Sequence, residues 1–146
     1  MKKFKFNLEK VLEVRQIEEE LAQNRLFQAR QRAEEIEKQL TRLEDLQKGL
    51  YSFLRGEKEL SVAENIQARN YMYINRRKIA ETEESFLSQE REVARCREDF
   101  LDRRRKREVL EKLKEKEFKR YHRKLLYKEQ KELDEIGQRA GDLQRV

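Results

Sequence analysis

The chain has 146 residues, of which 45% are charged and 36% hydrophobic, with no Pro, no Trp and only 4 Gly. So few turn-forming residues exclude a compact fold of many short elements, and so few apolar residues exclude a large globular core. The composition therefore predicts an all-α protein whose long helices share a narrow apolar seam. We expect one elongated domain over residues 1–146.

The first predicted helix runs from about Leu8 to Arg55. Asn7 is a favourable N-cap residue, and Glu9 places negative charge at the positive end of the helix dipole. The apolar residues begin as a wide band and then narrow to the 4-3 alternation that is typical of a coiled-coil seam. The band is Leu8, Val11, Leu12, Val14, Ile17 and Leu21, and the alternation is Ala22, Leu26, Ala29, Ala33, Ile36, Leu40, Leu43, Gln47, Leu50 and Leu54.

A turn is predicted over residues 56–60. Gly56 can adopt the left-handed conformation that ends a helix, and Ser61 with Glu64 matches a capping box for the next helix. This second helix is expected from about Ser61 to Ile136, with a frayed tail at residues 137–146. The sequence thus predicts a long antiparallel two-helix coiled-coil hairpin. Because the helices would be roughly 70 Å and 115 Å long, the C-terminal helix should overhang its partner.

A turn centred near residue 58 also predicts which residues face each other across the seam. The expected pairs are Leu50 with Ile66, Leu43 with Tyr73, Ile36 with Ala80, Ala29 with Leu87 and Ala22 with Ala94. A second stripe lies one position away at a spacing of seven, namely Met72, Ile79, Phe86, Val93 and Phe100. The combined stripe is broader than one helix covers, so the remainder either widens the seam or contacts a partner or a second copy.

Four consecutive bulky residues follow the turn: Tyr71, Met72, Tyr73 and Ile74. Side chains about 100° apart sweep most of a helix circumference, so they cannot all face the first helix. At least one large apolar group should therefore be exposed. The segment is either a bulky part of the seam or a binding patch, since aromatic and Met side chains are favoured at interfaces.

The segment from Leu101 to Gln130 holds 13 Lys or Arg against 6 Asp or Glu, and it begins with Arg103, Arg104, Arg105, Lys106 and Arg107. The predicted register places these five opposite Glu9 and Glu13, which would neutralise part of the charge. The remaining charge suits an acidic protein partner. Nucleic acid is the other alternative, but the leucine heptads that should follow a zipper-type basic region are absent.

The sequence offers no site for catalysis, a metal or a cofactor, so we expect a protein that is not an enzyme. Its single Cys96 and single His122 lie far apart in the chain, and no Gly-rich phosphate loop is present. The basic start MKKFKF is followed by no apolar core, and the longest apolar run is the segment YMYI. We therefore expect neither a signal peptide nor insertion into a membrane.

Three blocks together resemble the flagellar type III export protein family FliJ. The first is Phe4-x-Phe6-x-Leu8-Glu9-x-Val11-Leu12-x-Val14-Arg15, the second is YMYINR, and the third is EQKELDEI from Glu129 to Ile136. They occur in order along the whole chain. The resemblance implies a two-helix antiparallel coiled coil similar to the central stalk of rotary ATP synthases.

The resemblance also implies partners: the hexameric export ATPase FliI, the export gate protein FlhA, the regulator FliH and export chaperones. It implies a cytoplasmic protein held peripherally at the membrane by the export apparatus. From charge and exposure we assign Phe4, Phe6 and Arg103 to Arg107 to the ATPase side, and Tyr71, Met72, Tyr73 and Ile74 to the gate side. The alternatives are a structural coiled-coil scaffold and a basic helical nucleic-acid-binding protein.

Overall fold

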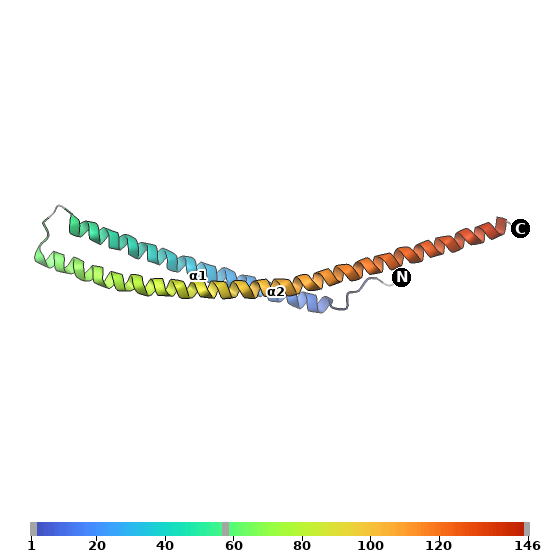
Figure 1. Cartoon of the computed structure of the whole chain (residues 1–146), viewed down its shortest axis with the longest axis horizontal. Helices are drawn as coiled ribbons and strands as arrows, with labels where there is room; N and C mark the ends of the chain where they lie inside the picture. The colour runs from blue at the N-terminus through green and yellow to red at the C-terminus, as the bar shows by residue number, and fades with distance from the viewer. Residues whose placement is uncertain (1–2, 57–58, 145–146) are drawn as a thin grey trace. The chain divides into compact units, whose positions relative to one another are not determined.

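The computed structural model describes residues 3–56 and 59–144, and these residues form two long helices (Figure 1). Helix α1 spans Glu9–Arg55 and helix α2 spans Val62–Gln144. The described residues contain no strand. The all-α prediction and the packing of two long helices against each other are confirmed.

The helix starts are set by local hydrogen bonds. The amide of Glu9 donates to the carbonyl of Phe6 at 3.2 Å, so α1 begins one residue after the expected Leu8. At the start of α2, the amide of Glu64 donates to Ser61 Oγ at 3.1 Å, which is the first half of the predicted capping box. Ser61 is therefore the N-cap of α2.

Helix α1 ends at Arg55 as predicted, but the conformation expected at Gly56 and the predicted end of the second helix are wrong. No described glycine has a positive φ, so Gly56 does not end α1 by a left-handed conformation; its amide donates to the Phe53 carbonyl at 3.4 Å in a tight last turn. The second helix was expected to end at Ile136, but α2 continues to Gln144. Gly137 and Gly141 lower helix propensity without blocking the backbone hydrogen bonds, and Gln, Arg, Ala and Leu around them favour the helix.

The chain divides into two units. The hairpin unit is Glu20–Leu101, and the terminal unit consists of the described residues of Met1–Glu19 and Asp102–Val146. The hairpin unit contains the end of α1, the turn and the start of α2, with the two helices side by side and antiparallel (Figure 1). The terminal unit pairs the first turns of α1 with the later part of α2.

The seam of α1 in the hairpin unit is confirmed residue by residue. All ten positions of the predicted alternation from Ala22 to Leu54 are buried or half-buried. Ala22, Leu26, Ala29 and Ala33 are the most buried apolar members. Small side chains at three of these four positions let the two backbones approach closely, as in other tightly packed coiled coils.

The seam predicted for the second helix is wrong by one residue. Ile66, Tyr73, Ala80, Leu87 and Ala94 are all exposed. The buried or half-buried positions instead include Ala68, Met72, Asn75, Ile79, Thr82, Phe86, Gln89, Val93, Cys96 and Phe100. The second stripe therefore faces α1, and small or polar residues alternate with it along the seam.

The register of the hairpin unit is fixed by two side chains of α2 that reach α1 backbone. Asn75 Nδ2 donates to the Leu43 carbonyl at 3.0 Å, and Gln89 Nε2 donates to the Ala29 carbonyl at 3.0 Å. Leu43 was expected opposite Tyr73 and Ala29 opposite Leu87. In both places the seam residue of α2 lies two positions further along the chain, because the turn is longer than the sequence suggested.

The C-terminal part of α2 has no neighbouring helix among the described residues of the terminal unit. Every residue from 126 to 144 is exposed, a segment that we call the overhang (Figure 1). It carries Leu126, Leu133, Ile136 and Leu143 on its surface. Within the described part of the chain, neither helix has a stretch both long and apolar enough to cross a membrane.

Candidate partner-binding sites

The basic residues Arg103 and Arg107 join the two helices of the terminal unit. Arg103 Nη1 donates to Glu18 Oε2 at 3.0 Å. Arg107 binds Glu19 through two of its nitrogens, and its Nη1 also donates to Glu111 at 2.6 Å. Both Arg side chains occupy seam positions of α2, so they replace an apolar layer by ion pairs between the helices.

The three residues between them behave differently. Arg104 pairs with Glu108 at 3.0 Å and Lys106 with Asp102 at 3.4 Å, in both cases along α2 itself. Arg105 is exposed and forms no ion pair with any residue that the structure describes. Most of the charge of this segment is thus met inside the chain, and Arg105 is the residue that remains for a partner.

The expected carboxylates opposite the basic segment are wrong. Glu9 and Glu13 were expected there, but Glu18 and Glu19 occupy these places. Glu9 pairs with Lys114 instead, at 2.8 Å. The displacement is larger than the two positions found in the hairpin unit.

The ion pairs shift two pKa values. Hydrogen bonds from Arg15 at 3.1 Å and from Arg103 lower the pKa of the Glu18 carboxyl below its ordinary value, although partial burial opposes this. The hydrogen bond to Glu19, with a second to Glu111, raises the pKa of the Arg107 guanidinium above its ordinary value. Both groups therefore stay charged at neutral pH.

The N-terminal segment before α1 is fastened to α2 by aromatic side chains. Phe6 is buried. The Phe4 ring meets Phe118 edge to face with a centroid distance of 5.4 Å and lies tilted against Tyr121 at 5.6 Å. His122 stacks on Phe118 at 6.3 Å, a packing role for the single histidine. Phe4 and Phe6, assigned above to the ATPase side, hold this segment in place.

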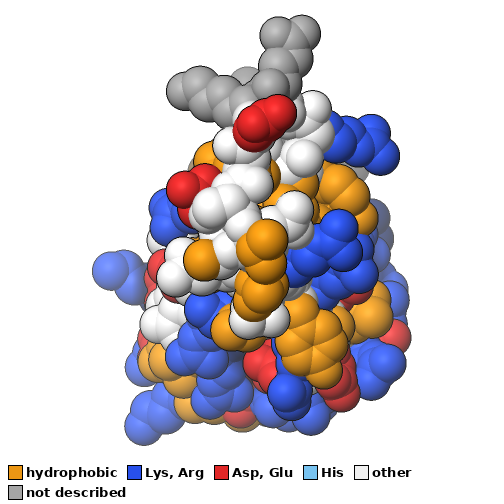
Figure 2. All heavy atoms as spheres, turned by 90° about the vertical axis from the view of Figure 1, so that its left-hand side faces the viewer, with side chains coloured by type: hydrophobic (Ala, Val, Ile, Leu, Met, Phe, Trp, Pro, Cys, Tyr) orange, Lys and Arg blue, Asp and Glu red, His pale blue; other side chains and the backbone are white. Residues whose placement is uncertain are grey.

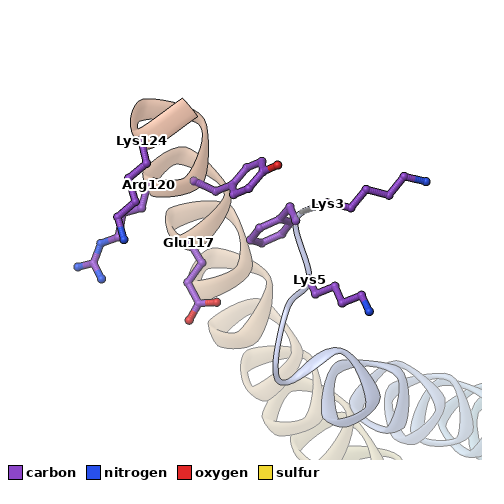
Figure 3. A pocket seen from close by; sticks show the side chains of 7 residues that line it. Lys3, Lys5, Glu117, Arg120 and Lys124 are labelled. Carbon is purple, nitrogen blue, oxygen red and sulfur yellow. The ribbon is translucent and has the colours of Figure 1, made fainter. Parts of the chain in front are cut away.

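A groove of about 800 Å³ runs beside this aromatic contact (Figure 3). Its lining residues are Lys3, Phe4, Lys5, Glu117, Arg120, Tyr121 and Lys124. This groove was not predicted from the sequence, because total charge does not show which charges are paired. A usable indication was present: Lys116, Arg120 and Lys124 are spaced by four, which places like charges next to each other on a helix.

The segment Tyr71 to Ile74 in the hairpin unit separates into buried and exposed residues. Met72 is only 8% exposed, whereas Tyr71, Tyr73 and Ile74 are 49%, 64% and 51% exposed. The Tyr71 side chain also lines a surface groove with Phe53 and Leu50. At the end of the hairpin unit that carries the turn, hydrophobic side chains reach the surface among Lys and Arg (Figure 2). The expected exposure of a large apolar group is confirmed.

A chemical centre is not apparent in the part of the chain that the structure describes. No group of three or more His, Cys, Asp or Glu residues there is arranged to hold a metal ion. Cys96 is a half-buried seam residue, and its Sγ lies 3.6 Å from Glu92 Oε1.

The family model described as "Flagellar FliJ protein" matches residues 4–145. The chain belongs to the FliJ family. Neither a curated protein nor a solved structure matches the sequence. As a FliJ family member, the chain is a component of the flagellar protein export apparatus.

The structure gathers the assigned residues of this FliJ family member into two groups. Phe4, Phe6 and the segment Arg103 to Arg107 all lie in the terminal unit, although they are far apart in the sequence. Tyr71 to Ile74 lie in the hairpin unit. Each group can therefore be changed by mutation without touching the other unit.

Proposed function

We propose that the chain is a non-enzymatic adaptor that binds the hexameric export ATPase FliI as a central stalk and links it to the export gate protein FlhA. The regulator FliH and export chaperones are further partners in this proposal. It would place the chain in the cytoplasm, held peripherally at the membrane by the export apparatus. The observation that carries the proposal is the presence of two separate surfaces, a basic one in the terminal unit and an aromatic one in the hairpin unit.

The proposed ATPase side comprises Phe4, Phe6 and Arg103 to Arg107, with different roles for its members. Arg103 and Arg107 hold α1 against α2 through Glu18 and Glu19. Arg104, Arg105 and Lys106 are exposed; Arg104 and Lys106 pair with carboxylates along α2, and Arg105 carries the unpaired charge. Exposed charges at the edge of an interface attract and orient an acidic partner surface, and they contribute less to the affinity of the complex.

The proposed gate side comprises Tyr71, Met72, Tyr73 and Ile74. Exposed aromatic side chains provide large contact areas at little entropic cost, so Tyr71 and Tyr73 are suited to be anchors. Met72 lies in the seam beneath them and keeps their stretch of helix in position. FlhA would then contact the side chains of Tyr71, Tyr73 and Ile74, which Met72 supports from the seam.

The experiment that tests the proposal measures the ATP hydrolysis rate of the cognate FliI with and without the chain. We expect stimulation by the unchanged chain and its loss in the triple variant R104Q/R105Q/K106Q, which leaves the ion pairs between the helices intact. The triple variant K38Q/R42Q/K48Q removes the same charge from exposed positions of α1 and serves as the matched control. Unchanged stimulation by the first variant, or equal loss in the control, would refute the assignment.

A further inference from the structure

The least neutralised basic site of the terminal unit is the groove beside Phe4. Lys3, Lys5, Arg120 and Lys124 line it, all four are exposed, and none forms an ion pair within the described residues. In the neighbouring segment Arg103 to Arg107, by contrast, four of the five charges are paired. The groove therefore brings together four cations that have no carboxylate partner among the described residues.

The same cations belong to a longer ladder on α2. Residues 112, 116, 120, 124 and 128 are Lys, Lys, Arg, Lys and Lys, so each has a like charge one turn away. Like charges at this spacing destabilise a helix. An anion bound across Arg120 and Lys124 would remove this repulsion, so the free chain favours such a ligand.

The groove also has an apolar floor. Phe4 and Tyr121, both half-buried, lie between the cations of the N-terminal segment and those of α2. In Figure 3, Lys3 and Lys5 extend to one side and Arg120 and Lys124 to the other. A ligand that lies along the groove would meet positive charge, then an apolar surface, then positive charge again.

We infer that this groove binds an acidic peptide segment of a partner protein, with carboxylates on both cation pairs and an apolar side chain on Phe4 and Tyr121. Glu117 also lines the groove, with no ion pair described for it, and it suits a peptide, which can offer an amide or a cation. A nucleic acid fits less well, since the Glu117 carboxylate in the lining would repel its phosphates. The inference goes beyond the proposed function and does not depend on FliI being the source of the peptide.

The test is fluorescence anisotropy of a labelled twelve-residue peptide of Glu and Asp with one central Phe, titrated with the full chain. We expect binding that weakens about tenfold in R120Q/K124Q and in K3Q/K5Q, the size of effect found for paired charges at interfaces. The matched control is K38Q/R42Q, an exposed Lys and Arg also spaced by four on α1, which should change the affinity less than twofold. Circular dichroism checks that each variant remains helical.

Two further probes separate the alternatives. A peptide with Gln in place of every acidic residue should not bind. The variant Phe4→Ala should weaken the binding of the acidic peptide that carries Phe more than the binding of one that carries Ala. A single-stranded oligonucleotide of equal charge tests the competing ligand. The inference would be overturned if K38Q/R42Q lost as much affinity as the groove variants, or if the acidic peptide did not bind. It would also be overturned if the oligonucleotide bound more tightly than the peptide and the same groove variants weakened its binding. ATPase stimulation is measured separately, so failure here is distinct from failure of the proposed function.

Discussion

Asn75 and Gln47 form a buried polar layer between α2 and α1. Asn75 Nδ2 donates to Gln47 Oε1 at 2.7 Å, and the two residues are only 3% and 9% exposed. Gln47 Nε2 is buried without a hydrogen-bond partner in the described structure. A polar layer in an apolar seam chiefly specifies the register of the two helices, since a shift of either helix would leave both amides without a hydrogen-bond partner.

Replacing one member of this layer should cost more than replacing both. Asn75→Ala leaves Gln47 and the Leu43 carbonyl without their donor, so we expect a loss of about 1–3 kcal/mol in the free energy of unfolding. The double variant N75L/Q47L should be close to neutral or more stable, because no buried polar group remains. Urea denaturation followed by circular dichroism measures both. An additive double variant would show that the two amides do not interact.

Arg107 and Arg105 should differ in their effect on stability. Arg107→Gln removes the pair with Glu19 between the helices, and we expect a loss of about 1 kcal/mol because the pair is partly screened by solvent. Arg105→Gln removes a charge without a partner and should leave the melting temperature unchanged. Thermal denaturation of the two single variants decides between these outcomes; equal melting temperatures would mean that the Glu19 pair contributes nothing measurable.

The pair of neighbours Met72 and Tyr73 separates stability from binding. Met72→Ala opens space in the seam and should destabilise the chain by about 2 kcal/mol. Tyr73→Ala removes an exposed ring, so stability should change by less than about 0.5 kcal/mol while affinity for FlhA falls. Binding to immobilised FlhA is measured beside chemical denaturation. Destabilisation by Tyr73→Ala would assign that ring to the packing of the hairpin.

The Glu18 carboxyl predicts a specific loss of stability in acid. Its pKa is lower in the folded chain than the ordinary value of about 4.3, so its contribution is complete above that pH and disappears as the pH falls through the folded value. The difference in melting temperature between the unchanged chain and Glu18→Gln should therefore shrink below about pH 4. Glu44→Gln, which alters an exposed carboxylate outside any described ion pair, is the control. A difference that stays constant down to pH 2 would contradict the role of the ion pair.

Truncation after Leu125 should remove helix content without loosening the packed helices. The deleted segment contains the overhang, in which every described residue is exposed, so no contact between α1 and α2 is lost. Far-ultraviolet circular dichroism should fall in proportion to the deleted residues while the denaturation midpoint stays the same. A lower midpoint would mean that the overhang packs against another part of the chain.

The sequence was sufficient for the seam of α1 and insufficient for that of α2. In α1 a single apolar stripe exists, so its periodicity identifies each buried position from Ala22 to Leu54. In α2 two stripes lie one residue apart, and periodicity cannot choose between Met72 and Tyr73. The choice depends on which neighbours pack, and Asn75 and Gln89 complete the seam through hydrogen bonds to α1 that a hydrophobic pattern does not record.

The binding surfaces show a similar division. The basic segment and the exposed aromatic residues could be recognised from the sequence. The ion pairs that neutralise most of the basic segment could not. Glu18 and Glu19 neutralise Arg103 and Arg107 because the helices of the terminal unit lie in another register than the sequence predicted. Phe4 brings Lys3 and Lys5 beside Arg120 through a contact between residues more than a hundred positions apart, which no local pattern predicts.

The overhang keeps its backbone hydrogen bonds without help from any neighbour, and it contains Gly137 and Gly141. An isolated helix of this length is only marginally stable in water, and each glycine costs it about 1 kcal/mol relative to alanine. Amide protons along α2 should therefore exchange with deuterium in a gradient that is fastest near Gln144, because opening there requires no separation of helices. A partner that captures the overhang as a helix would slow exchange in that segment alone. Deuterium uptake of the unlabelled chain thus reports whether this segment is occupied, even while the partner is still unidentified.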